Sequence, residues 1–110
     1  MSKKMAETIY SKLSGVTRHN PDGSDRQEII SELCYDGQPL LLMRRPNQYS
    51  YDNIDVYVAF QVGYVNPELA EMLAPLIDEG GAVESRVSGI TGGSEDKPTL
   101  GVNIEFTVFD

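Results

Sequence analysis

The stretch QVGYVNPELAEMLAPLID, residues 61–78, predicts a β-strand that leads directly into an α-helix. Tyr64 is typical of a strand end, and Gly63 before it indicates a bulge or a close approach of another backbone. Asn66 is a favourable helix N-cap, and Pro67 suits the first helical position because an N–H there would have no partner within the helix. The stretch therefore contains two elements and the joint between them.

The helical half of this stretch carries one apolar stripe. Its apolar residues recur at the helical spacing, which predicts a helix with a single buried face. Pro75 interrupts the pattern because it cannot donate a hydrogen bond to the carbonyl of Glu71, so we expect a kink or a change of helical pitch there. The stripe consists of Leu69, Met72, Leu73, Leu76 and Ile77.

The rest of the chain predicts one more helix and several strands. The turn sequence HNPDG, residues 19–23, precedes a Ser-x-x-Gln capping box formed by Ser24 and Gln27, so we expect a short helix from Asp25 to about Leu33. Alternating or continuous apolar residues predict the strands. These strands are expected over residues 8–17, 38–45, 54–60, 62–65, 82–91 and 100–109.

Together these elements predict an α+β fold with about five to seven strands and two short helices. The sheet is expected to be mostly antiparallel and to curl into a small barrel, because closure removes exposed strand edges. Residues 1–7 are polar and are expected to be frayed. Residues 8–110 contain no internal repeat and no long linker, so we expect a single domain.

The composition is typical of a soluble globular protein, with 40% hydrophobic and 24% charged residues in a chain of 110. No apolar run approaches about 20 residues, and the N-terminus lacks the apolar core of a signal peptide, so we expect a cytoplasmic protein with no membrane partner. Cys34 is the only cysteine, so no internal disulfide and no thiolate zinc cluster can form, and the single histidine, His19, further argues against a transition-metal site. No cofactor is expected.

The net charge of −8 is unevenly distributed along the chain. Residues 1–50 contain seven Lys and Arg against six Asp and Glu, a net charge of +1, whereas residues 51–110 contain two against eleven, a net charge of −9. Such a field repels duplex DNA, so a nucleic-acid site would have to be local and built mainly from the first half. The alternative is an acidic surface that only keeps the protein in solution.

Three passages resemble a HIRAN domain. The resemblance covers roughly residues 8–108 and implies a small six-stranded β-barrel of OB-like character with two helices. ITGG at residues 90–93 is similar to the stand-alone bacterial form of the family. The passages are SGVTR at residues 14–18 with RQEII at 26–30, LLLMRRPN at 40–47 with the Tyr-Asp loop after it, and VGYV at 62–65 with PELA at 67–70.

The resemblance implies a non-enzymatic module that binds single-stranded DNA. In this family the domain grips the 3′ end of a single strand, and it stands at the front of helicase-like remodellers of stalled replication forks. An aromatic stack holds an unpaired base without reading its identity, cations meet phosphates, and a carboxylate can accept from the terminal hydroxyl. This chain carries no motor, so an ATPase partner would be a separate protein.

Basic and aromatic residues of the loops are the candidates for DNA contacts. Arg18 lies at the basic–aromatic position after the first strand, and Tyr51 with Asp52 matches the Tyr-Asp pair of the family by residue type. Tyr49 competes with Tyr51 for the stacking role. The full candidate set is Arg18, His19, Arg44, Arg45, Tyr49, Tyr51, Asp52 and Tyr64.

The candidates also have plainer explanations. Arg44 and Arg45 can be solvated residues at a strand end that pair with nearby acids. The tyrosines can pack at the barrel rim with their hydroxyls in water. Asp52 with Asp55 can form a carboxylate pair or a magnesium site, but two acids in such a segment are more often only solvated.

A second function stays open, that of a protein–protein or self-association module without DNA binding. Tyr64 stands where the DNA-gripping members of the family have a histidine, and Pro67 where they have a lysine. Tyr10, Tyr57 and Phe109 fall off the inward faces of their predicted strands, which motivates a homo-oligomer. Convergence of the candidate residues on one groove would favour DNA binding, and their scattering would favour self-association.

Overall fold

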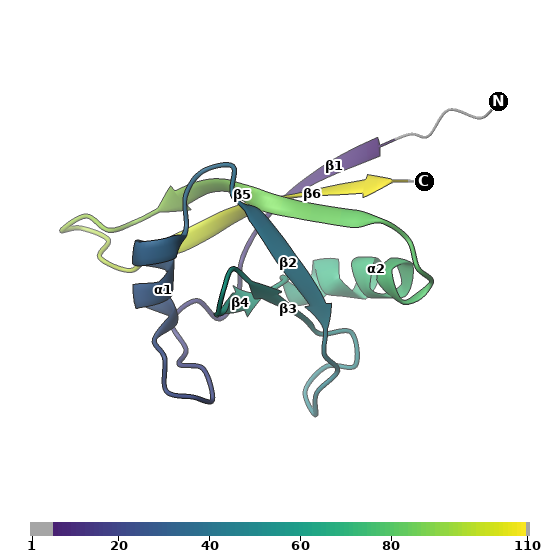
Figure 1. Cartoon of the computed structure of the whole chain (residues 1–110), viewed down its shortest axis with the longest axis horizontal. Helices are drawn as coiled ribbons and strands as arrows, with labels where there is room; N and C mark the ends of the chain where they lie inside the picture. Colours follow the sequence, from purple (N-terminus) through teal and green to yellow (C-terminus); the bar gives the residue numbers. More distant parts are fainter. Residues whose placement is uncertain (1–5, 110) are drawn as a thin grey trace.

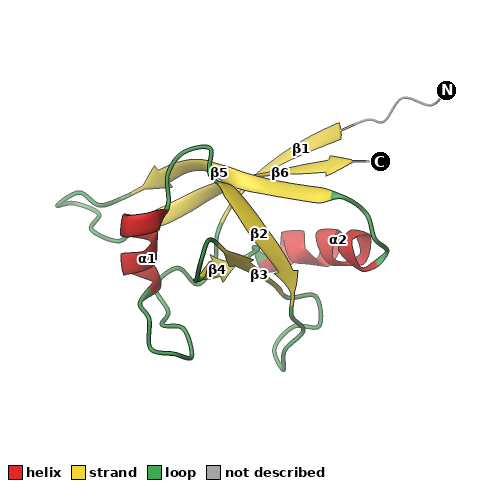
Figure 2. Cartoon of the chain, in the orientation of Figure 1, coloured by secondary structure: helices red, strands yellow, loops and turns green. Residues whose placement is uncertain are grey.

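The computed structural model describes residues 6–109, which form six strands and two helices (Figure 1, Figure 2). In this part of the chain neither helix is long and apolar enough to cross a membrane. The strands are β1 (Ala6–Lys12), β2 (Pro39–Arg44), β3 (Ile54–Tyr57), β4 (Gln61–Tyr64), β5 (Val83–Thr91) and β6 (Gly101–Phe109), and the helices are α1 (Arg26–Leu33) and α2 (Pro67–Asp78).

The first strand differs from its predicted bounds. It begins at Ala6, ahead of the predicted start at Thr8, and residues 1–5 of the segment expected to be frayed lie outside the described residues. It ends at Lys12, well before residue 17, because the chain turns away from the sheet at Gly15, where φ is +71°. The loop after β1 therefore leaves the sheet and becomes available to line a site.

The six strands form one antiparallel sheet in the order β1-β6-β5-β2-β3-β4. Within residues 6–109, the two ends of this order are joined by a single isolated bridge between Ser14 and Tyr64. The N–H of each residue donates to the carbonyl of the other at 2.9 Å. The sheet is thus a curled half-barrel, and the predicted α+β fold with a small antiparallel OB-like barrel and two short helices is confirmed.

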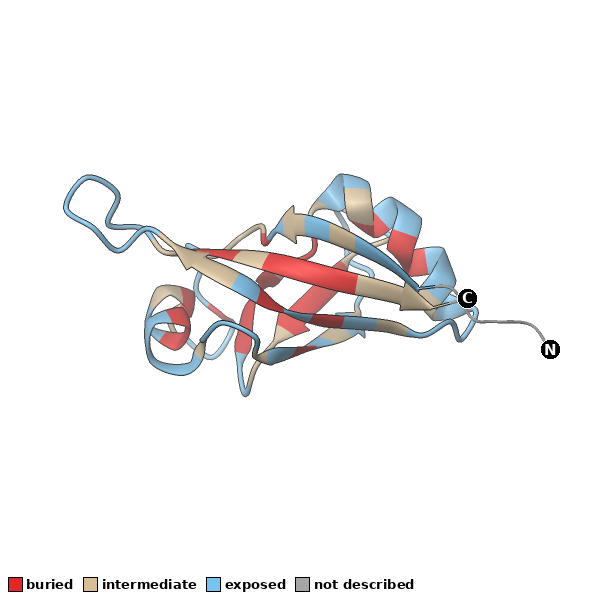
Figure 3. Cartoon of the chain, turned by 90° about the horizontal axis from the view of Figure 1, so that it is seen from above, coloured by how far each residue is buried: buried red, intermediate tan, exposed pale blue. Residues whose placement is uncertain are grey.

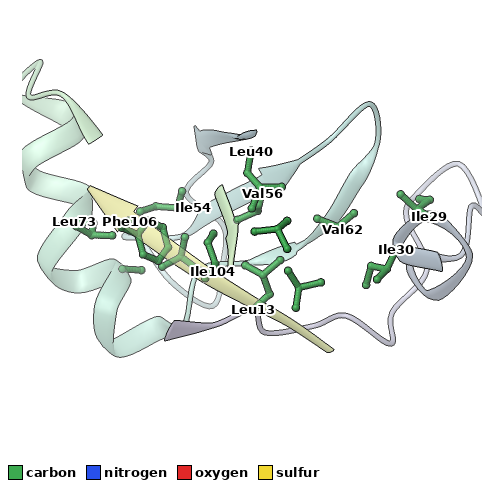
Figure 4. Close-up of a cluster of buried hydrophobic side chains, with 14 of the residues drawn as sticks. Leu13, Ile29, Ile30, Leu40, Ile54, Val56, Val62, Leu73, Ile104 and Phe106 are labelled. Atoms are coloured by element: carbon green, nitrogen blue, oxygen red, sulfur yellow. The ribbon is translucent and has the colours of Figure 1, made fainter. Parts of the chain in front are cut away.

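The core fills the inside of this half-barrel (Figure 4). Phe106 and Ile104 of β6, Ile54 of β3 and Leu73 of α2 are fully buried, and Ile30 of α1 is buried beyond Val62 in the same view. The inward positions predicted for the centre of the last strand, Ile104 and Phe106, are buried as expected, but Glu105 between them is buried too, so the predicted alternation is wrong at this residue.

The buried face of α2 is rotated from the predicted one. Ala70, Leu73 and Ala74 are buried, whereas Met72 is 50% exposed and Leu76 is 36% exposed. The prediction was wrong at these two residues because the helix packs through its alanines, whose small side chains allow a close approach to the core. Figure 3 shows buried and exposed residues on different sides of this helix.

The ends and length of α2 agree with its sequence signals. The Asn66 side chain accepts a hydrogen bond from the Glu68 amide at 3.0 Å, so the predicted N-cap is confirmed. Pro67 occupies the first helical position. The helix continues as one element through Pro75 to Asp78.

The cap of α1 is Asp25 rather than Ser24. The Asp25 carboxylate accepts from the Gln27 amide at 2.9 Å, while the Ser24 hydroxyl donates to Asp22 at 2.6 Å. The predicted capping box is therefore wrong. The Gln27 side chain instead binds Leu100 through both its amide oxygen and its amide nitrogen, at 2.7 and 2.9 Å, and donates to the Val16 carbonyl at 2.9 Å. It ties the loop after β1 to the start of β6.

Candidate functional site

A groove of about 990 Å³ opens between the loop after β1, the loop between β2 and β3, and the joint of β4 with α2. Figure 1 shows the chain before α1 and the β2–β3 loop extending from the same side of the barrel. Arg18 lines the groove from the first segment, Tyr49 from the second and Tyr64 from the third. Three of the predicted residues, far apart in sequence, therefore share one groove.

Two glycines shape the groove beside Tyr64. A Cβ atom at Gly63 would lie 2.6 Å from the Ser14 carbonyl oxygen, so only glycine allows the two backbones to form the closing bridge. The predicted close approach at Gly63 is thereby confirmed. Gly15, which lines the groove, has a positive φ, and a Cβ there would lie 2.6 Å from Cδ2 of the Tyr64 ring.

A buried arginine holds the Tyr64 ring from behind. Arg26 is only 2% exposed, and its guanidinium carbon lies 4.8 Å from the centre of the Tyr64 ring. Its three hydrogen bonds go to the Asn20 side-chain oxygen at 2.7 Å, the Gly15 carbonyl at 2.9 Å and the Tyr64 hydroxyl at 3.3 Å. Arg26 thus connects the two residues that meet at the groove wall, although the sequence alone marked it only as part of the family resemblance.

The loop between β2 and β3 presents Tyr49 to solvent. The Asn47 side-chain oxygen accepts hydrogen bonds from the amides of Tyr49 at 2.8 Å and Ser50 at 2.9 Å. The Asn47 amide in turn donates to the Ser50 carbonyl at 3.0 Å. This turn holds the backbone while the Tyr49 side chain, 86% exposed, remains unpacked and able to stack on a planar ligand.

The charges at the groove are mixed. Arg18 is exposed and makes no ion pair with any residue from 6 to 109. Glu71 lines the groove from α2. With Tyr49, Tyr64 and one exposed arginine, the groove can stack a planar ring and meet one anion, but it carries no continuous basic track of the kind that follows a long polyanion.

Comparison with solved structures shows two similar chains of known fold. A crystal structure of a protein from Lactobacillus plantarum, a structural genomics target, superposes with a TM-score of 0.68 at 19% identity over 96% of this chain and 99% of that one. The NMR structure of the HLTF HIRAN domain superposes with a TM-score of 0.61 at 18% identity over 96% of this chain and 78% of that one.

The chain has a HIRAN-like fold. No family model and no curated protein matches the sequence. At 18–19% identity the likeness is one of fold, so the roles of the groove residues depend on their own contacts.

Arg44 was predicted as a DNA contact, but its guanidinium makes hydrogen bonds within the protein. Its guanidinium donates to both carboxylate oxygens of Asp78 at 2.9 and 3.0 Å, and to the carbonyls of Tyr51 and Asn53 at 2.8 and 3.0 Å. It also lies 5.4 Å from the centre of the Tyr51 ring. Arg44 therefore fastens the β2–β3 loop to the end of α2 and does not line the groove.

The Arg44–Asp78 pair predicts a pH-dependent stability. The hydrogen bond from Arg44 lowers the pKa of the Asp78 carboxyl below its ordinary value of 3.8. Because the folded-state pKa is the lower one, this stabilisation is fully present above the unfolded-state pKa and is lost as the pH falls through the folded-state pKa. We expect Asp78→Asn to be less stable than wild type in urea unfolding at neutral pH, and the difference to shrink below pH 3.8.

Glu79→Gln is the matched control, since it removes the same charge from the next residue, which is exposed and makes no ion pair with the described residues. The difference in unfolding free energy between Glu79→Gln and wild type should not shrink below pH 3.8. An Asp78→Asn difference that persists unchanged at low pH would contradict the assignment.

The other predicted contacts lie outside the groove lining. The Arg45 guanidinium lies 3.6 Å from the buried Asp55 carboxylate, which also accepts from Asn53 at 2.8 Å. Asp55 is therefore engaged, and residues 6–109 contain no group of three His, Cys, Asp or Glu side chains placed to hold a metal ion. His19 lies 4.0 Å from Asp25. The predicted residues that do not line the groove are His19, Arg44, Arg45, Tyr51 and Asp52.

Proposed function

We propose that this groove binds the free 3′ end of single-stranded DNA. The observation that supports it is the gathering of Arg18, Tyr49 and Tyr64 from three separate segments at one groove. A tyrosine face holds an unpaired base of any identity, and an exposed arginine meets a phosphate. The HIRAN-like fold supports the same function, because the family resemblance seen in the sequence implies a grip on a 3′ end.

The charge of the chain limits the ligand to a short segment. A net charge of −8 repels a long polyanion, and Glu71 adds a negative charge to the lining. A strand end brings only its last few phosphates close to the protein, and its unpaired bases are free to stack. The proposed ligand is therefore a strand terminus rather than a duplex.

The test is fluorescence-anisotropy binding at low salt, where phosphate contacts are strongest. One single strand carries a 5′ fluorophore and a free 3′ hydroxyl, and its twin carries a 3′ phosphate. We expect the free hydroxyl end to bind more tightly. Absence of binding to both strands at low salt would contradict the proposal.

Two single substitutions should weaken binding in different ways. Tyr49→Ala removes a stacking face, and we expect roughly tenfold weaker binding, since stacking contributes about 1–3 kcal/mol per base. Arg18→Ala should weaken binding of all sequences and reduce the slope of log affinity against log salt by about one.

Tyr10→Ala and Arg86→Ala are the controls, because these exposed residues lie outside the groove lining. Arg86→Ala makes the same change in net charge as Arg18→Ala. If the control and groove variants lost affinity equally, the effect would be one of overall charge or of non-specific packing, and the groove would not be the site.

The second candidate function is self-association through β1. Among residues 6–109 this strand pairs with β6 on one side only, whereas the other end of the strand order is bridged to Ser14. Tyr10 on β1 is 69% exposed. Unpaired strand edges are templates for pairing with another chain. A concentration-dependent dimer in sedimentation velocity, together with no binding of either strand, would favour this function over the first.

A further inference from the structure

Arg26 is a buried cation whose hydrogen-bond partners are all neutral. Its side chain donates to Asn20, Gly15 and Tyr64, and none of these groups carries a negative charge. Among residues 6–109, no Asp or Glu oxygen lies within 4.0 Å of its guanidinium nitrogens. Arginine is almost never fully buried unless it is paired, because an uncompensated charge in the interior is costly. Arg26 therefore lacks a counter-charge within the described chain.

The charge of Arg26 reaches the groove through two of its partners. Gly15 and Tyr64 both line the groove. A Cβ at Gly15 would lie 2.6 Å from the Tyr64 ring and 3.3 Å from Nη1 of Arg26, so the glycine lets the ring and the guanidinium pack directly against the groove wall. An anion beside Gly15 would thus approach a guanidinium that is already held in place.

The Tyr64 hydroxyl is oriented by the same arginine. It accepts a hydrogen bond from Nη2 of Arg26 at 3.3 Å. A hydroxyl that accepts from a cation keeps its own O–H proton, which it can donate to another group. A donor next to a fixed positive charge matches an anionic acceptor, because hydrogen bonds to charged groups are shorter and stronger than neutral ones.

We propose that a phosphate of the bound strand lies beside Gly15, accepts a hydrogen bond from the Tyr64 hydroxyl and supplies the counter-charge that Arg26 lacks. The inference rests on the proposed function, since it takes the phosphate from the strand. It assigns to Arg26 the role of a positioning residue and to Tyr64 that of a direct contact. Arg18 remains a separate contact on the exposed side.

The decisive variant is Tyr64→Phe, which removes the hydroxyl and keeps the ring that packs against Arg26 and Gly15. The probe is a 5′-labelled oligothymidylate with a free 3′ hydroxyl, together with a twin whose last linkages are neutral methylphosphonates. We expect Tyr64→Phe to bind the phosphate strand roughly ten- to a hundredfold more weakly, as for loss of a hydrogen bond to a charged group. Its affinity for the methylphosphonate strand should be within about twofold of that of wild type. Removing the hydroxyl and neutralising the phosphate abolish the same interaction, so the second change adds little to the first.

Tyr57→Phe is the matched control. It also loses a hydroxyl that makes a hydrogen bond, to Asp55 at 3.4 Å, but it lies outside the groove lining. It should not discriminate between the two strands. If Tyr64→Phe had the same effect on the phosphate and methylphosphonate strands, the hydroxyl would not contact a phosphate and the proposal would be overturned.

A second arm separates this inference from DNA binding itself. Inorganic pyrophosphate is titrated into ¹⁵N-labelled protein while the amide signals of Gly15 and Tyr64 are followed. We expect both signals to shift in wild type, with affinity weaker by about tenfold or more in Tyr64→Phe. Pyrophosphate binding without strand binding would support the anion site and contradict the proposed function. Strand binding with no effect of Tyr64→Phe and no shift at Gly15 would overturn the anion site and leave the proposed function standing.

Discussion

Gly63→Ala should lower the free energy of unfolding by about 3 kcal/mol, since overpacking costs about 1–3 kcal/mol and each lost hydrogen bond adds about 1 kcal/mol. The new Cβ would lie 2.6 Å from the Ser14 carbonyl oxygen, which belongs to the backbone and cannot turn aside as a flexible side chain could. The two 2.9 Å hydrogen bonds between Ser14 and Tyr64 would have to lengthen or break. Urea unfolding followed by circular dichroism measures the loss.

The control for this substitution is Gly89→Ala in β5. A Cβ at Gly89 would have its nearest neighbour, Nδ2 of Asn103, at 4.0 Å, which is an ordinary van der Waals contact without a clash. Loss of backbone freedom in the unfolded chain should leave this variant neutral or slightly more stable, by up to about 1 kcal/mol. If Gly63→Ala and Gly89→Ala were destabilised equally, the closing bridge would contribute no more to stability than an ordinary position in a strand.

Gly15→Ala should combine a similar loss of stability with the largest loss of strand binding among the variants. The positive φ of +71° costs a non-glycine residue about 1–2 kcal/mol, and contact at 2.6 Å with the Tyr64 ring adds about 1–3 kcal/mol. The methyl group would also cover Nη1 of Arg26. We expect more than tenfold weaker binding of the free 3′ end, measured by anisotropy on protein that is verified to be folded.

Gly23→Ala separates the cost of a positive φ from the cost of a steric clash. Gly23 has a φ of +89°, and no atom lies within 4 Å of the position that a Cβ would take. It carries the conformational cost alone, about 1–2 kcal/mol, and lies outside the groove lining. Its strand binding should equal that of wild type. Unchanged binding in Gly15→Ala would remove Gly15 from the site.

Signals that act within a few residues predicted the fold well. The Asn66 cap, Pro67 at the first helical position and the inward-facing apolar residues of β6 all depend on neighbours in sequence, and all are seen in the structure, although Glu105 on the other face of β6 is buried as well. The face of α2 was predicted less well. Counting large apolar residues favoured Met72, whereas the helix packs through Ala70 because a small side chain decides how closely a helix can approach the core.

The site was predictable only in part, for a related reason. Arg18, Tyr49 and Tyr64 could be selected by residue type, since exposed arginines and tyrosines suit nucleic acids whatever their partners. The pairing of Arg44 with Asp78 joins residues 34 apart in sequence and has no local signal. Arg26 could not be recognised as buried either, because an arginine near a helix start ordinarily extends into water.

We expect the bridge between Ser14 and Tyr64 to open more readily than the long strand pairs of the sheet. It has two backbone hydrogen bonds, whereas β5 and β6 pair along most of their length. Amide hydrogen exchange proceeds through such local openings, which need little free energy where few contacts hold the chain. A ligand that contacts both Ser14 and Tyr64 binds the closed form alone and slows exchange at these two amides. Opening of the barrel and occupancy of the groove would therefore be linked in one equilibrium.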